Sequence, residues 1–204
     1  MDVAGLVVGF AAGIVASIAA WWIVLIYFTP RIEVSALNRL PRAPDVEPCG
    51  YRYRVKVRNL QRSYGIAELS LHARLVIRGL DEKRPEVFTA FAIPVGDAVP
   101  FPFLDGRRAR ERVEDSERVY TLRVHDLVDN APKLMPAEVH VALQSRTQQL
   151  EELLTLGSDA FVRIAVTSSH ARSGFRRTIA TRARREEITE GEFVEDSVDV
   201  ECAR

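Results

Sequence analysis

The sequence has no excess of either charge and lacks the motifs of the common enzyme classes. Its 28 basic and 28 acidic residues cancel, whereas a dedicated nucleic-acid binder carries a strong basic balance. No Gly-rich phosphate loop follows a predicted strand, and neither G-x-S-x-G nor H-E-x-x-H occurs. The sequence therefore predicts a protein that is not an enzyme, has no cofactor and does not bind nucleic acid.

Cysteine and histidine are also scarce, which bears on metal chemistry. The two cysteines, Cys49 and Cys202, are far apart in the sequence and form neither a metal-type spacing nor a disulfide framework. Reduced thiols in a cytosolic domain are therefore the prediction. The histidines occur singly in four segments, as His72, His125, His140 and His170. We predict no metal site and no catalytic residue.

The longest hydrophobic run, residues 3–28, determines whether the rest of the chain is attached to a membrane. Its only ionisable side chain is that of Tyr27. As a helix the run would extend about 39 Å at the usual rise per residue. That length crosses a hydrocarbon core about 30 Å thick with some tilt. The sequence predicts a single transmembrane helix, with the lipid bilayer as a partner.

Two alternatives explain this run less well. A buried helix of a soluble domain seldom stays apolar on every face over such a length. A cleaved signal peptide would begin with basic residues and end at a small-residue site. Here the chain starts with Met1-Asp2, and the apolar run continues through residues 21–26, beyond the small residues at 17–19.

Basic residues follow the run and none precedes it. The positive-inside rule therefore predicts a cytoplasmic C-terminal domain, anchored in the cell membrane. Arg31, Arg39 and Arg42 could contact anionic lipid headgroups, each contributing about 1 kcal/mol near the surface. Interleaved acidic residues would cancel much of that attraction.

Small residues recur every fourth position in the run, as Gly5, Gly9, Gly13 and Ser17. This spacing places them in one row along a helix, where a second helix could approach closely. Glycine and alanine are also common in membrane helices for other reasons. The row nevertheless predicts self-association, with a homo-oligomer as the product.

Segments of alternating or β-branched residues follow the run, separated by turn residues. Strands are predicted at 31–37, 51–58, 69–77, 87–93, 119–124, 137–143, 161–167, 175–183 and 188–194. The strict alternation of residues 51–58 predicts one buried and one solvated face. A short helix is expected at residues 147–156, ending at Gly157.

These elements predict a mainly β fold, an antiparallel immunoglobulin-like β-sandwich preceded by one N-terminal transmembrane helix. The predicted organisation is a helix at residues 1–28, a linker at 29–50, the β-sandwich domain at 51–194 and an acidic tail at 195–204. Because functional residues favour loops on rigid scaffolds, the loop joining the two strands after residue 160 carries the best candidates of this domain. They are His170, Arg172 and Gly174.

Three strings, at residues 162–165, 169–175 and 187–193, carry a resemblance to a known family. They are similar to the C-terminal cytoplasmic β-sandwich of inward-rectifier potassium channels and of small uncharacterised one-helix membrane proteins with a related domain. The resemblance implies a cytoplasmic sandwich that lies under the membrane and assembles side by side. It does not extend to conduction, because those channels have two membrane helices and a filter motif that this chain lacks.

Three functional hypotheses remain open at this point. The first is a single-pass membrane protein with a cytoplasmic interaction module that self-associates. The second is an accessory or regulatory subunit of a channel or transporter, with a multi-span membrane protein as its partner. The third is a membrane-tethered ligand sensor, for which no constellation of polar residues stands out.

Overall fold

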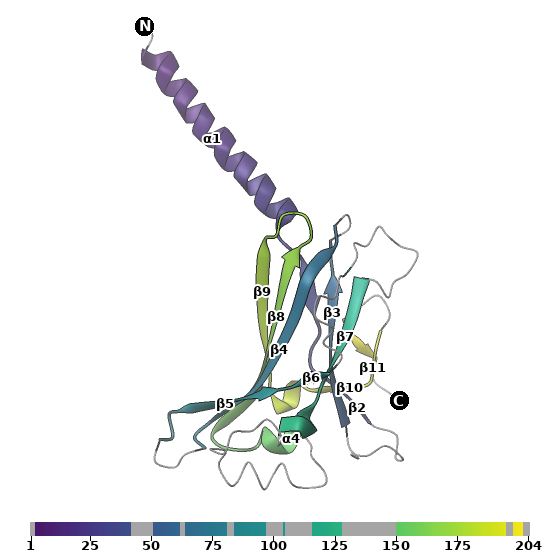
Figure 1. Cartoon of the computed structure of the whole chain (residues 1–204). Coiled ribbons are helices and arrows are strands. Elements are labelled where there is room, and N and C mark those ends of the chain that lie inside the picture. The colour runs from purple at the N-terminus through teal and green to yellow at the C-terminus, as the bar shows by residue number, and fades with distance from the viewer. Residues whose placement is uncertain are drawn as a thin grey trace.

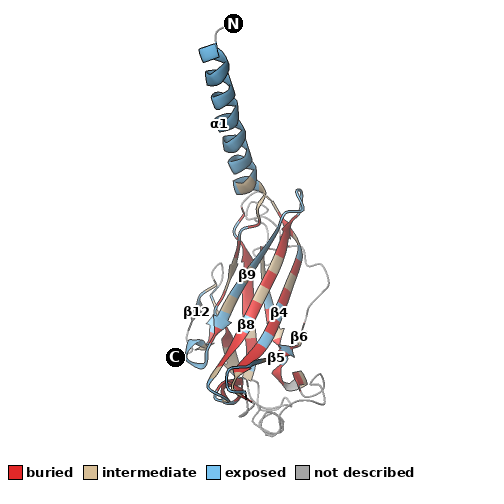
Figure 2. Ribbon diagram, turned by 90° about the vertical axis from the view of Figure 1, so that its left-hand side faces the viewer, coloured by how far each residue is buried: buried red, intermediate tan, exposed pale blue. Residues whose placement is uncertain are grey.

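A long helix projects from one end of an elongated β-rich domain in the computed structural model (Figure 1). The structure describes residues 3–41, 51–61, 64–80, 84–96, 104, 116–127, 150–194 and 198–201. Helix α1, Val3–Phe28, has 26 residues, and none of them is buried (Figure 2). It is long and apolar enough to cross a membrane, as the sequence predicts.

One sheet is built around strand β3. Its strands are β1 (Ile32–Val34), β2 (Asn38–Pro41), β3 (Tyr51–Asn59), β6 (Val95–Gly96), β7 (Glu117–Leu122) and β10 (Thr189–Glu190). They run in the order β10-β2-β3-β7-β6, and β1 also pairs with β3. All these pairs are antiparallel except β10 with β2, which is parallel. The predicted antiparallel pairing therefore holds in this sheet except at this edge.

The second sheet contains the longest strands. It comprises β4 (Ile66–Arg78), β5 (Phe88–Ile93), β8 (Asp159–His170) and β9 (Arg176–Ala183), in the antiparallel order β5-β4-β8-β9. A small separate hairpin pairs β11 (Glu192–Phe193) with β12 (Val200–Glu201). Short helical turns are η2 (Val124–Asp126), α4 (Leu150–Leu153) and η3 (Arg185–Glu187).

A single hydrophobic core lies between the two main sheets. Side chains from β3 and β7 in one sheet and from β4 and β8 in the other belong to one buried cluster. On β4 the alternating residues predicted to line one face are all buried: Leu69, Leu71, Ala73, Leu75 and Ile77. Alternation along β4 and β8 therefore directs these apolar side chains inward and places most of the polar ones on the outer face, which also carries Val76 and Phe161.

The prediction of a solvated outer face on β3 holds at exposed Arg52 but is wrong at Lys56 and Arg58. Lys56 and Arg58, on the polar side of the alternation, are 4% and 6% exposed. The residue after β11 contributes to the burial of Lys56, since Lys56 Nζ donates a 2.9 Å hydrogen bond to the carbonyl of Val194. Glu117 on β7 supplies the opposite charge, 2.5 Å from Lys56 Nζ.

Other predicted elements differ at their boundaries. Strand β1 falls within the strand predicted at residues 31–37, whereas β2 lies in the stretch expected to be a linker, and Val200–Glu201 of the expected tail forms β12. Of the helix predicted at residues 147–156, the described part begins at residue 150, and Leu150–Leu153 is helical; Gly157 takes the positive φ that ends such segments. The strand predicted at residues 137–143, both cysteines, Arg42 and His140 lie outside the described residues.

Candidate functional site

The helix is tied to the β-domain by hydrogen bonds to its last residues and to the two residues that follow. Ser173 Oγ donates to the carbonyl of Phe28 at 3.2 Å. Gln61 Nε2 donates to the carbonyl of Thr29 at 3.1 Å, and Arg177 Nη1 to that of Pro30 at 3.4 Å. Gln61 lies in the β3–β4 connection, Ser173 in the β8–β9 turn and Arg177 on β9. We call this region the junction: Phe28, Gln61, Tyr64, residues 170–174 and Arg177.

His170 is the buried centre of the junction, with 1% of its surface exposed. Its ring lies edge-on to Phe28 and close to Tyr64, at centroid distances of 5.5 and 5.2 Å. Nδ1 accepts hydrogen bonds from the backbone N–H groups of Arg172 and Ser173, at 3.3 and 3.2 Å. Nδ1 must therefore be unprotonated, which places the proton of the neutral ring on Nε2. Among the described residues, Nε2 has no hydrogen-bond partner.

Burial, followed by the positive charge of Arg172, lowers the pKa of His170 below its usual value. Protonation of Nδ1 would remove the acceptor of two backbone N–H groups. It would also place a positive charge in a buried site between aromatic rings. The neutral form is thus the one that holds the turn against the helix.

We predict that the folded domain loses stability as the pH falls below about 6.5, the ordinary pKa of histidine. Between that value and the lowered folded-state pKa, the unfolded chain binds more protons than the folded one. The stabilisation is therefore complete above this window and decreases as the pH drops through it. Urea unfolding of the full chain in detergent, at about pH 7.5 and about pH 5.5, measures the effect.

The matched variants are His170→Gln and His72→Gln, the second at an exposed position of β4. The His170→Gln protein should show a flatter dependence of unfolding free energy on pH, whereas His72→Gln should follow the parent. If the unfolding free energy of His170→Gln depends on pH as that of the parent does, the pH dependence does not come from His170.

The other two candidates of this loop shape the β8–β9 turn. The guanidinium of exposed Arg172 lies 5.1 Å from the ring centre of Tyr64, a cation–π contact that covers the junction. Gly174 has a φ of +70°, and its N–H donates to the carbonyl of His170 at 2.9 Å. The structure therefore brings His170, Arg172 and Gly174 together at the end of the helix.

The arginines predicted to meet lipid headgroups do not act together. Arg31 is exposed and lies three residues after the helix, but Arg39 is held elsewhere. Its guanidinium pairs with Glu151 at 2.8 Å and with Glu190 at 2.6 Å, on β2 near α4 and away from the helix (Figure 1). The hydrogen bond that Arg39 donates to the Glu151 carboxylate is the main cause that raises the pKa of Arg39. The headgroup contact of Arg39 stays a prediction, and two carboxylates already pair with its guanidinium.

The same cluster encloses Tyr53, which is 1% exposed. Its hydroxyl donates to the Glu151 carboxylate and accepts a 2.9 Å hydrogen bond from the N–H of Leu150. Burial, and then the Glu151 bond, raise the pKa of Tyr53. These bonds tie β2, β3 and β10 to α4.

The predicted helix-contact residues lie in one exposed groove of α1. Gly9, Gly13 and Ser17 line it together with larger apolar neighbours. The Ser17 hydroxyl donates within the helix to the carbonyl of Gly13, at 2.8 Å. Gly5 continues the row toward the N-terminus. Among the described residues, no group of three His, Cys, Asp or Glu side chains could hold a metal ion.

Sequence reasoning missed Gln61, Tyr64, Ser173 and Arg177 at the junction. In the sequence, residues 59–64 and 168–174 lie between predicted strands, with no indication that these two connections meet. The antiparallel pairing of β4 with β8 brings them to one end, because Ile66 lies opposite His170. The sequence could have indicated this contact only if it had shown which strands pair with each other.

In the described residues, a β-rich domain is hydrogen-bonded directly to the end of one long apolar helix. No protein-family model matches the chain, and a search of curated proteins finds no match either. The resemblance to the inward-rectifier domain accordingly stays a prediction.

Proposed function

We propose that the chain is a single-pass membrane protein whose β-domain is a non-enzymatic interaction module, held under the cytoplasmic face of the cell membrane. The observation that carries this proposal is the junction. An apolar helix with no buried residue requires lipid or other helices around it. The hydrogen bonds from Ser173, Gln61 and Arg177 fasten the domain to the helix end, which keeps the domain beside the bilayer.

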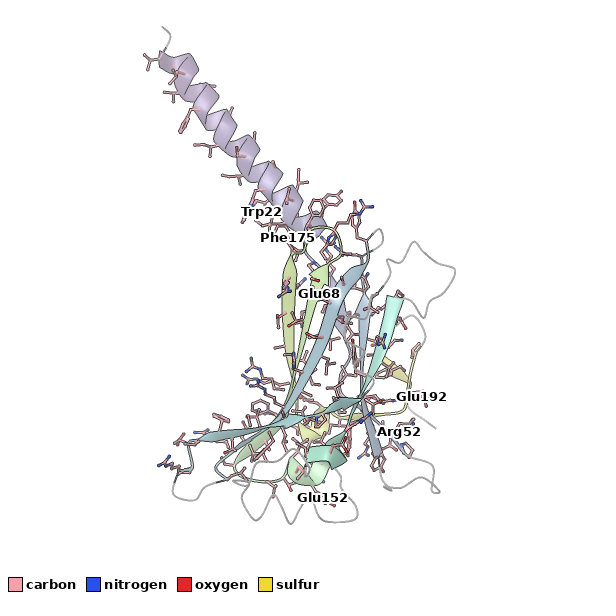
Figure 3. The ribbon with its side chains drawn as sticks, viewed as in Figure 1. Trp22, Arg52, Glu68, Glu152, Phe175 and Glu192 are labelled. Atoms are coloured by element: carbon pink, nitrogen blue, oxygen red, sulfur yellow. The ribbon has the colours of Figure 1, made fainter. Side chains whose placement is uncertain are left out.

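Charge and aromatic residues around the junction support the orientation. Arg31, Arg172 and Arg177 all lie at this end of the domain, so cationic groups concentrate where the helix leaves the membrane. Trp22 on the helix and Phe175 at the start of β9 lie at the same end (Figure 3), and they are 59% and 43% exposed. Exposed aromatic rings at such a level suit the interface of a bilayer.

The groove on α1 supports self-association. A Cβ added at Gly9 or Gly13 meets nothing within 4 Å in this chain. The small side chains are therefore not needed for packing within the protein, whereas they would allow a second helix to approach closely. The two facing sheets are also compatible with the immunoglobulin-like architecture that we propose for the module, although the parallel pair β10–β2 departs from it.

We expect Gly9→Leu combined with Gly13→Leu to abolish a covalent dimer formed by a membrane-permeant bismaleimide in intact cells. Both cysteines follow the helix in sequence, so dimer formation reports association. Bulky side chains in the groove would separate the helices. Pretreatment with a membrane-impermeant maleimide should leave the dimer intact, because a cytoplasmic domain is shielded from that reagent.

The control is Ala11→Leu combined with Val15→Leu, which adds bulk on the opposite face at 100° per residue and should preserve the dimer. Equal crosslinking in both variants contradicts the helix contact. Blocking by the impermeant maleimide contradicts the orientation. Crosslinking to a multi-span membrane protein in place of a second copy would favour the accessory-subunit hypothesis.

A further inference from the structure

The outer face of the sheet β5-β4-β8-β9 carries a row of arginines across three adjacent strands. Arg74 on β4 lies directly opposite Arg163 on β8, and Arg163 lies opposite Arg182 on β9. All three side chains are exposed. With strands about 4.8 Å apart, three positive charges fall within about 10 Å. Figure 2 shows these strands side by side.

Like charges directly opposite each other on neighbouring strands are destabilising. The other arginines of this face are compensated: Arg176 pairs with Glu68 at 2.8 Å, Arg78 pairs with Glu86, and Arg184 lies 3.6 Å from Asp159. Among the described residues, Arg74 and Arg163 have no acidic partner. The uncompensated charge is therefore confined to the middle of the sheet.

A hollow coincides with this charge. It has a volume of about 250 Å³ and is lined by His72, Arg74, Arg163 and Ala165. The small side chain of Ala165 opposite His72 makes room between the two arginines and the imidazole. This volume is below the range of about 300–1,000 Å³ typical of sites for drug-sized molecules. The size suits a small anion, and the guanidinium groups suit tetrahedral oxyanions.

We propose that this hollow binds a phosphate group, either the free ion or the phosphate of a small metabolite, between Arg74 and Arg163 with His72 at its rim. Arg182 adds to the attraction from β9, where its guanidinium is anchored 5.1 Å from the ring centre of Phe161. Bound phosphate would offset the repulsion within the row, so binding would also stabilise the domain.

A lipid headgroup is out of reach of this site. His170 marks the helix end of β8, and Arg163 lies seven residues away, about 23 Å along the strand. That separation is nearly three times the Debye length of about 8 Å at physiological ionic strength. The phosphate must therefore come from solution.

Titration calorimetry of the full chain in nanodiscs of neutral lipid tests the proposal, with inorganic phosphate and pyrophosphate as probes. We expect saturable binding at one site per chain, against a chloride control of equal ionic strength. Because charge-assisted hydrogen bonds would be lost, Arg163→Gln and Arg74→Gln should each weaken the affinity about tenfold or more. Arg78→Gln, on the same face but paired with Glu86, is the matched control and should bind as the parent does.

Arg163→Lys retains the charge but loses the two-pronged geometry, so it should bind at intermediate strength. Absence of saturation, or equal affinity in Arg163→Gln, Arg78→Gln and the parent, overturns the proposal. If phosphate binding is seen only in nanodiscs of anionic phospholipid, the effect belongs to the lipid headgroups, and the proposal is also overturned. If an oligoglutamate peptide saturates the site and phosphate does not bind, the proposal is overturned, and the ligand is an acidic protein segment.

Discussion

Replacing Glu117 with glutamine is expected to lower the free energy of unfolding by about 3 kcal/mol, because it leaves two buried cations without their counter-charge. Glu117 is the carboxylate shared by Lys56 and Arg58 on the neighbouring strand. Its oxygens lie 2.5 Å from Lys56 Nζ and 3.3 Å from Arg58 Nε, and the three side chains are only 10%, 5% and 8% exposed.

The expected loss lies at the lower end of the range for broken buried ion pairs. Lys56 keeps its hydrogen bond to the carbonyl of Val194, and Arg58 keeps a further interaction. What disappears is the Coulomb attraction in a site from which most water is excluded. The same replacement on an exposed pair should cost far less, since exposed pairs contribute about 0–1 kcal/mol.

Glu192→Gln is the matched control. Glu192 pairs with Arg54 at 3.0 Å, but its side chain is 67% exposed, and Figure 3 shows it at the edge of the domain. Urea unfolding of the full chain in detergent compares the two variants. In a double-mutant cycle, Lys56→Met should cost less in the Glu117→Gln background than alone. Equal losses for Glu117→Gln and Glu192→Gln would show that the cluster is solvated.

Gly157→Ala is expected to cost about 2 to 5 kcal/mol of stability, the sum of two separate penalties. Gly157 has a φ of +68°, a conformation that costs an L-residue about 1–2 kcal/mol. A Cβ there would also lie 2.2 Å from the carbonyl oxygen of Arg78 and 2.9 Å from Ile77 Cγ2. Overpacking of that kind costs about 1–3 kcal/mol more, because the backbone at the end of β4 must move.

Gly174→Ala isolates the first penalty. Gly174 has nearly the same φ, +70°, but an added Cβ meets nothing within 4 Å. Its loss should therefore stay at about 1–2 kcal/mol. Thermal unfolding followed by circular dichroism of the β signal distinguishes the two variants. If Gly157→Ala melts no lower than Gly174→Ala, the close approach to Arg78 is not a constraint on the fold.

The sequence anticipated the elements whose signals are local. The apolar run of residues 3–28 matches α1, Val3–Phe28, because length and composition alone decide whether a helix can lie in lipid. Strands β4 and β8 follow their alternation, and β4 ends at Arg78 before Gly79, as the positive φ of that glycine requires. Strand β2 escaped detection because four residues beside prolines give almost no periodic signal.

The candidate site was predicted only in part. The loop of His170, Arg172 and Gly174 was identified from its position between strands, yet its contact with Phe28 depends on which strands pair. Arg39 was assigned to the membrane surface because it follows the helix closely in sequence. Two carboxylates distant in sequence, Glu151 and Glu190, hold it on β2.

The sequence by itself determined that an apolar helix precedes a domain of short strands, since hydrophobicity and alternation act over a few consecutive residues. Only the tertiary structure decided that Lys56 and Arg58 are buried, that two turns fasten the helix end, and that three arginines stand in one row. Each of those outcomes depends on register between strands that are far apart in the chain. Register is fixed by the shared core between the sheets, which no local pattern records.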